Sequence, residues 1–182
     1  TRGIGAARDW IYQEFIKISK DCGGCLDVQK EAFVQPKANR IPEPTTLTNV
    51  FAILNGKTDA KRYYVVSGHY DSMCSSPTDA KCDAPGANDG ASGTAVSIEL
   101  ARVMSKRSFD ATIVFMAVPG EEQGLLGAAN FAEQAKVNKL NIEAMFTNDI
   151  VGGVTTQKGS VNRNKVRVFS EGVPSKETEQ QA

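Results

Sequence analysis

One histidine and several carboxylates follow apolar segments of this sequence, and these residue types bind divalent metals. In chain order they are His69, which is the only histidine among 182 residues, Asp71, Asp89, Glu121, Glu122 and Asp149. A set of imidazole and carboxylate ligands without cysteine suits Zn, Mn or Co, with Zn the usual metal at a hydrolytic site. The sequence therefore predicts one divalent-metal site assembled from several strand ends.

The spacing of these residues suggests how they could divide the work. Residues i and i+2 of an extended chain project to the same side, so Asp71 can accept the far ring N–H of His69 and fix its tautomer. Adjacent side chains diverge, so one of Glu121 and Glu122 can bind metal while the other takes a proton from a metal-activated water. Asp89 lies just before a helix amino end, where the helix dipole favours a carboxylate.

Each of these residues also has an ordinary structural interpretation. A lone histidine at a strand end is more often a structural or surface residue, and adjacent glutamates usually belong to a solvated face. The sequence Asn88-Asp89-Gly90 is a good turn by itself. The conjunction favours a metal site, because each acidic element follows a predicted buried strand and nearby glycines let the backbone crowd a compact centre.

Hydrophobic patterning predicts the elements that position these residues. Helices are expected at 2–20, 92–105 and 124–137, and strands at 26–34, 46–54, 63–67, 111–118 and 142–148, with a further candidate strand at 165–169. The nearly unbroken apolar run at 111–118 suits a central strand buried on both faces. Asn55-Gly56 is a tight-turn sequence, so we expect a hairpin from strand 46–54 into strand 63–67.

Strands that alternate with helices from residue 63 onward predict an α/β fold with three layers, in which helices flank a mixed, mostly parallel sheet. Functional groups in such sheets gather beyond the carboxyl ends of the strands. His69, the two glutamates and Asp149 would then meet at one edge. We expect one domain over residues 1–182.

Composition limits the classes of partner. The formal net charge is zero and basic residues form no long run, which argues against nucleic acid and anionic membranes as partners. No apolar run reaches the length of a membrane span. The chain starts at Thr1 without a Met, which a removed leader or trimming would explain. No sequence feature indicates an oligomeric state.

Four cysteines favour a secreted or periplasmic protein, because all of them can pair. Cys74 and Cys82 flank a short polar loop, and a disulfide that closes this loop is the preferred interpretation. Cys22 and Cys25 have CxxC spacing but follow a predicted helix, whereas a thioredoxin-type motif would precede one. A four-thiolate zinc site built from both pairs is the less favoured alternative.

Three motifs in this order resemble the co-catalytic zinc aminopeptidases, a family that includes secreted bacterial leucine aminopeptidases, aminopeptidase S-like enzymes and relatives of glutaminyl cyclase. They are residues 68–72 (GHYDS), 86–93 (GANDGASG) and 120–127 (GEEQGLLG), and residues 146–152 (FTNDIVG) resemble the family's next ligand segment. The resemblance covers most of the chain.

The resemblance implies a metallopeptidase that holds two zinc ions and hydrolyses amino-terminal peptide bonds of substrates with a free amino terminus. Asp89 would bridge the two ions, His69 and Asp149 would complete the first, and Glu122 would bind the second. Glu121 would act as general base and Asp71 would orient His69. Members of the family often have a cis peptide after the bridging Asp, which is the Asp89–Gly90 bond here.

The sequence departs from the family at one ligand. The family supplies a further histidine to the second zinc from near the end of the catalytic domain. His69 is the only histidine in this sequence, so no other residue can play that part. The chain also stops where the family continues, so it resembles the amino-terminal part of a longer enzyme. We expect weak activity or none from these 182 residues alone. A glutaminyl cyclase-like acyltransferase with one zinc and a non-catalytic binding module are the alternatives.

Overall fold

The computed structural model describes residues 3–79 and 81–155, together with residues 159, 161, 163, 164 and 168. The chain divides into two compact units, residues 1–152 and 153–182. The described part of the second unit includes an antiparallel bridge between Thr155 and Val161. The candidate strand at 165–169 lies outside the described residues, apart from Val168.

The first unit contains three helices and five strands among its described residues. They are α1 (Ile4–Asp21), β1 (Leu26–Gln35), β2 (Thr45–Leu54), β3 (Asp59–His69), α2 (Ala91–Met104), β4 (Ala111–Val118), α3 (Leu126–Val137) and β5 (Asn141–Thr147). Helix α3 begins two residues later than predicted because Gly124 and Leu125 have φ angles of 120° and 59°, outside the helical region. None of the described helices combines the length and apolar character that crossing a membrane requires.

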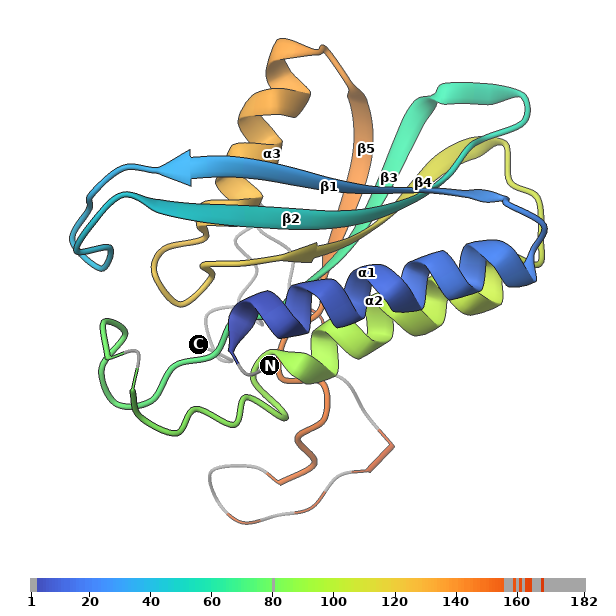
Figure 1. The fold of residues 1–182 in the computed structure, drawn as a ribbon. Coiled ribbons are helices and arrows are strands. Elements are labelled where there is room, and N and C mark those ends of the chain that lie inside the picture. The colour runs from blue at the N-terminus through green and yellow to red at the C-terminus, as the bar shows by residue number, and fades with distance from the viewer. Residues whose placement is uncertain are drawn as a thin grey trace, which may run out of the picture. The chain divides into compact units, whose positions relative to one another are not determined.

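The five strands form one mixed sheet in the order β1-β2-β4-β3-β5 (Figure 1). β1 pairs with β2 and β2 with β4 in antiparallel fashion, whereas β3 is parallel to both β4 and β5. The carboxyl ends of β4, β3 and β5 therefore lie at one edge of the sheet. This arrangement confirms the predicted α/β class with a mixed sheet flanked by helices.

The predicted hairpin between β2 and β3 is wrong, because β4 lies between these two strands. Gly56 explains the error. A Cβ atom on Gly56 would lie 2.2 Å from the carbonyl oxygen of Asp110, and its N–H donates to Oγ1 of Thr112 at 3.0 Å. The glycine allows the start of β4 to approach the chain closely, and it does not form a tight turn into β3.

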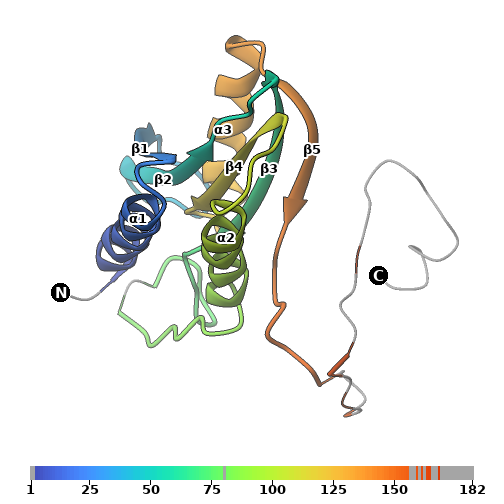
Figure 2. The ribbon, with the colours of Figure 1, turned by 90° about the vertical axis from the view of Figure 1, so that its right-hand side faces the viewer.

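The hydrophobic core consists of two layers, one on each face of the sheet. Ile113, Phe115 and Ala117 of β4 belong to a cluster that includes Ile11, Phe15 and Ile18 of α1 and Ala101 of α2. The alternate β4 residues Val114, Met116 and Val118 belong to a second cluster, against which Phe131 of α3 packs. Figures 1 and 2 show α1 and α2 side by side on one face and α3 on the other. β4 is buried along its whole length, as predicted.

Small residues bring β3, α2 and β5 together at the carboxyl edge. A Cβ atom on Gly68 would lie 2.3 Å from the backbone of Gly93, and one on Gly93 would lie 1.9 Å from the carbonyl oxygen of Asn148. Asn148 donates both its backbone N–H and its side-chain amide to the carbonyl oxygen of Ser67, at 2.8 and 3.1 Å. Any larger side chain at Gly68 or Gly93 would separate the segments that carry the predicted site residues.

Candidate metal centre

His69 ends β3, and its side chain is only 3% exposed. Its Nδ1 lies 3.1 Å from the carbonyl oxygen of Asp71. A carbonyl can only accept a hydrogen bond, so Nδ1 carries the proton and Nε2 is the ring atom available to a metal. Oγ1 of Thr94 donates to the backbone carbonyl of His69 at 2.7 Å and ties the strand end to α2.

Two carboxylates from different segments face Nε2 of His69. Oδ1 of Asp89, just ahead of α2, lies 3.0 Å from Nε2, and Oδ1 of Asp149, just after β5, lies 3.4 Å from it. One ligand atom from each of the three residues lies within 4.8 Å of the other two. Both carboxylate side chains are about half exposed, at 50% and 45%. The structure thus gathers three predicted ligands at one point that is open on the carboxylate side.

The backbone after Asp89 leaves space for the imidazole ring. A Cβ atom on Gly90 would lie 2.2 Å from Nε2 of His69, so only glycine fits at this position. The Asp89–Gly90 peptide bond is cis, which is the feature that the resemblance implied.

Glu121 and Glu122 lie on the loop after β4, and both side chains are partly buried. Among the described residues, the three-residue cluster at His69 does not include Glu122. Burial raises the pKa of the Glu121 carboxyl, and the nearby charges of Asp149, Asp71 and Asp89 raise it further, while His69 opposes them. Burial, Asp89 and Glu121 raise the pKa of Glu122 in the same way. A carboxyl with a raised pKa beside a group of candidate metal ligands is suited to proton transfer.

Asp71 connects His69 with the glutamate loop, which is the loop after β4 that carries Glu121 and Glu122. Its Oδ1 lies 3.5 Å from Nδ1 of His69, and its interaction with the ring raises the pKa of His69 to about 9 against the opposing effect of burial. Its two carboxylate oxygens also accept the backbone N–H groups of Glu121 and Glu122, each at 3.2 Å. Sequence reasoning missed this second contact, because nothing local links residues that are 50 positions apart.

The donor set fits a zinc ion. With its proton on Nδ1, His69 directs the Nε2 lone pair at two carboxylate oxygens, and three such acceptors need a shared cation. In the metal-free chain a proton on Nε2 can replace that cation, which agrees with the raised pKa of His69. One imidazole nitrogen and carboxylate oxygens are ordinary zinc ligands.

The cysteines are paired within each of the two segments. Cys74 is bonded to Cys82, as predicted, and Cys22 is bonded to Cys25. The four-thiolate zinc alternative is therefore wrong, because no cysteine thiol remains free. Asp79 lies close to Cys74 and Cys82, but the sulfur atoms there are committed to the disulfide.

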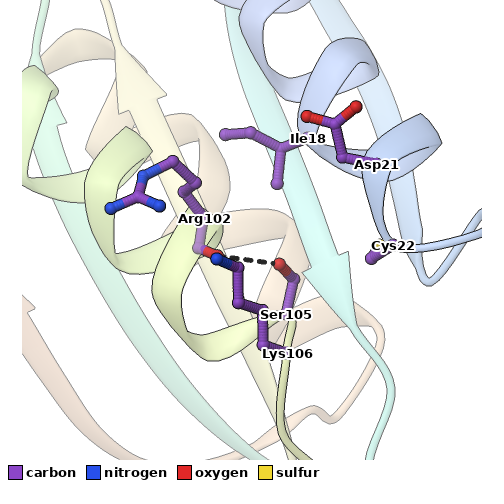
Figure 3. A pocket seen from close by; sticks show the side chains of 6 residues that line it. All are labelled: Ile18, Asp21, Cys22, Arg102, Ser105 and Lys106. Carbon is purple, nitrogen blue, oxygen red and sulfur yellow. Dashed lines mark hydrogen bonds between the residues drawn. The ribbon is translucent and has the colours of Figure 1, made fainter.

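A separate cavity of about 460 Å³ lies between the carboxyl-terminal ends of α1 and α2 (Figure 3). It is lined by Ile18, Asp21, Cys22, Arg102, Ser105 and Lys106. Asp89 precedes the opposite end of α2. The cavity is therefore not part of the metal centre.

Comparisons with known proteins bear on the same residues. The model of Peptidase family M28 matches residues 49–174. A probable zinc metalloprotease of Leptosphaeria maculans is 46% identical over 178 residues, which are 98% of this chain and 41% of that protein. The chain spans about two-fifths of the length of the curated relatives that it matches.

Two solved structures share the fold. The Legionella pneumophila LapA aminopeptidase is 20% identical with a TM-score of 0.57, and the match covers 78% of this chain and 34% of that one. A glutaminyl cyclase of an Acidobacteriales bacterium is 21% identical with a TM-score of 0.65, and the match covers 79% of this chain and 49% of that one. At this sequence identity the likeness shows the fold alone, and the fold is shared by an aminopeptidase and a glutaminyl cyclase.

Proposed function

This chain belongs to peptidase family M28, and from that premise we propose that it is part of a zinc-dependent aminopeptidase that removes residues from peptides with a free amino terminus. The observation that carries the proposal is the convergence of His69, Asp89 and Asp149 within 4.8 Å, with Glu121 in electrostatic contact with all three. The relatives named zinc metalloproteases support zinc as the metal and hydrolysis as the reaction.

Each residue has a defined task in this proposal. His69, Asp89 and Asp149 would hold the first zinc ion, and Asp89 and Glu122 would contribute to a second. When bound, zinc polarises a carbonyl and lowers the pKa of water. Glu121 would take a proton from the attacking water and pass it to the leaving amine, a transfer that its raised pKa favours.

The charge of the site supports an exopeptidase. Asp89 and Asp149 are about half exposed, so their outer oxygens can meet a substrate ammonium group. A blocked amino terminus would lose this interaction. The free amine is therefore the part of the substrate that the carboxylate-rich edge recognises in this proposal.

The proposal is tested on the full-length protein with aminoacyl p-nitroanilides and their N-acetylated counterparts. We expect turnover of the free amines only, loss of turnover on chelation, and recovery with zinc. Glu121→Ala should lower kcat by about 10²- to 10⁴-fold. Glu133→Ala is the matched control, because Glu133 is an exposed glutamate of α3. Undiminished turnover by Glu121→Ala would refute the assignment of the base.

Glutaminyl cyclisation is the second candidate, because a solved glutaminyl cyclase shares this fold with a TM-score of 0.65. A single-zinc cyclase would convert a peptide with amino-terminal glutamine to the pyroglutamyl form with release of ammonia. A zinc count on the full-length protein and an ammonia assay separate the two activities. Two zinc ions and no ammonia would support the aminopeptidase.

A non-catalytic binding module is less well supported, because it would have no need to retain the proposed base beside the ligand cluster. For localisation we propose a secreted or periplasmic protein. The two disulfides support an oxidising compartment.

A further inference from the structure

The loop that carries the two glutamates is only partly held by its own hydrogen bonds. The backbone N–H groups of Gly124 and Leu125 both donate to the carbonyl oxygen of Glu121, at 2.8 and 3.0 Å. Neither bond uses the carbonyl of Glu122. This carbonyl is instead bonded by a residue from another part of the fold.

Arg40 supplies that bond from the segment between β1 and β2. Its Nη1 donates to the carbonyl oxygen of Glu122 at 2.7 Å, across 82 positions of sequence. Ala38 and Ile41 exchange backbone hydrogen bonds on either side of Arg40, at 2.9 and 3.1 Å. Ile41 is 7% exposed and anchors this turn, so the turn presents Arg40 from a fixed base.

Asp71 also holds this stretch of backbone, through its side-chain carboxylate. The carboxylate of Asp71 accepts the N–H groups of Glu121 and Glu122, while Arg40 donates to the carbonyl that follows them. Gln123 adds a third attachment, because its Nε2 donates to the carbonyl oxygen of Pro77 at 3.2 Å. Residues 121–123 are thus attached at three points, one on the turn between β1 and β2 and two on the segment between β3 and α2.

We propose that Arg40 is a positioning residue, which holds the Glu121–Glu122 backbone so that the two carboxyl groups face the metal centre. This role rests on the proposed function of the two glutamates. Arg40 acts through the backbone and does not touch the reacting atoms. A charge-assisted bond of 2.7 Å to a carbonyl restricts the loop, and small displacements of catalytic groups are costly in rate.

The kinetic test compares three variants of the full-length protein. Arg40→Ala should lower kcat about tenfold at a wild-type KM, and the first zinc ion, which His69, Asp89 and Asp149 would hold, should stay fully bound. Arg40→Lys keeps a donor and should recover most of the loss. Arg107→Ala is the matched control, because Arg107 is exposed beyond the carboxyl-terminal end of α2 and should behave as wild type. A kcat for Arg40→Ala within twofold of wild type would overturn the proposal, as would loss of the first zinc ion in parallel with kcat.

Hydrogen exchange gives a second readout that needs neither substrate nor metal. Asp71 protects the amides of Glu121 and Glu122, and loss of Arg40 should let this loop open more often. We expect exchange about fivefold faster in a peptide covering residues 119–126 of Arg40→Ala, with the amides of β4 unchanged. Unchanged exchange would overturn the proposal. Faster exchange in a protein that cleaves no peptide would support the attachment and refute the proposed function.

Discussion

At the scale of single residues, both ring nitrogens of His69 have polar partners. Nδ1 donates to the backbone of Asp71, which fixes Nε2 toward Asp89 and Asp149. Because the bond at Nδ1 goes to a backbone carbonyl, a side-chain substitution at Asp71 leaves that acceptor in place. The carboxylate of Asp71 instead sets the basicity of the ring and the placement of the glutamate loop.

The raised pKa of His69 makes zinc binding dependent on pH. In the metal-free chain the pKa is about 9, so near neutral pH a zinc ion must displace a proton from the ring. We expect zinc affinity to rise about tenfold per pH unit between about pH 6 and pH 8, with about one proton released per ion. Calorimetry in buffers of different ionisation enthalpy measures this release, and an affinity independent of pH would contradict the prediction.

Folding of the metal-free chain should show the same linkage. His69 binds its proton more tightly when folded, since its pKa is about 9 against an ordinary value of 6.5. The resulting stabilisation is fully present below pH 6.5 and is lost as pH rises through 9. Urea unfolding at pH 6 and pH 9.5 measures the loss. His69→Gln is the control, and it should remove this part of the pH dependence.

Substitution of Gly90 should weaken metal binding, because the added Cβ would lie 2.2 Å from Nε2 of His69. We expect Gly90→Ala to weaken zinc binding by about 10- to 100-fold, as measured by competition with a chromophoric chelator. Gly5→Ala is the matched control. It lies within α1, where a Cβ meets no atom within 4 Å, and it should bind zinc normally with about 0.5–1 kcal/mol of added stability. Equal zinc affinities for the two variants would refute the steric argument.

At the scale of elements, local patterns predict the strands and helices but not all of their neighbours. β4 is recognisable because its apolar run reflects burial on both faces. Its insertion between β2 and β3 depends on contacts between residues that are far apart in sequence. A glycine at position 56 is compatible both with a tight turn and with a close approach of another segment, so the sequence does not distinguish the two. The contacts of Arg40 and Asp71 with the glutamate loop are equally long-range and leave no periodicity in the sequence.

The convergence of the site could be predicted because it follows from a rule about elements. His69 and Asp149 follow adjacent parallel strands, and the two glutamates follow the strand on the other side of β3. Their meeting at one edge needs only the shared parallel direction of β4, β3 and β5, which the alternation of strands and helices predicts. The asymmetric place of Glu122, outside the cluster at His69, depends on loop conformation instead, and the sequence does not encode that in a readable way.

The disulfide at Cys74 is expected to stabilise both the fold and the glutamate loop. It closes a segment with a sequence separation of 8, which corresponds to about 2–3 kcal/mol in the chain-entropy model. It also fixes the segment whose Pro77 carbonyl accepts from Gln123. The double variant Cys74→Ser/Cys82→Ser should therefore lose stability in urea and also lose kcat.

The other disulfide provides the matched control for this prediction. Cys22 and Cys25 are three positions apart at the end of α1, where no contact reaches the glutamate loop within the described residues. Cys22→Ser/Cys25→Ser should lower stability by less and leave kcat unchanged. Equal effects on kcat from the two double variants would show that the Cys74–Cys82 loop has no specific influence on the site.

At the scale of the whole molecule, the parallel and the antiparallel strands of the sheet contribute different residues to the site. The parallel strands β4, β3 and β5 deliver the histidine and carboxylates to one edge. The antiparallel strands β1 and β2 deliver no predicted ligand, but their connection carries Arg40. In the proposed function, this division places the candidate metal ligands at one edge and the attachment of the Glu121–Glu122 backbone to Arg40 beside them.

Zinc stoichiometry should separate this chain from the full-length protein. The first ion would have an imidazole and two carboxylates, whose ligand atoms lie within 4.8 Å of one another, whereas the second would have only the carboxylates of Asp89 and Glu122, because the chain contains one histidine. A pair of exposed or partly exposed carboxylates holds zinc far less firmly than a site that includes an imidazole. We expect one tightly bound zinc per 182-residue chain, none in His69→Ala, and two in the full-length protein.

Metal analysis after gel filtration measures these numbers directly. The relatives are more than twice as long as this chain, so residues outside it can complete the second ligand set. For the same reason we expect weak aminopeptidase turnover or none from the 182 residues, even when loaded with zinc. Two tightly bound ions in the short chain would show that Asp89 and Glu122 need no further histidine, and full turnover there would place the whole catalytic apparatus within residues 1–182.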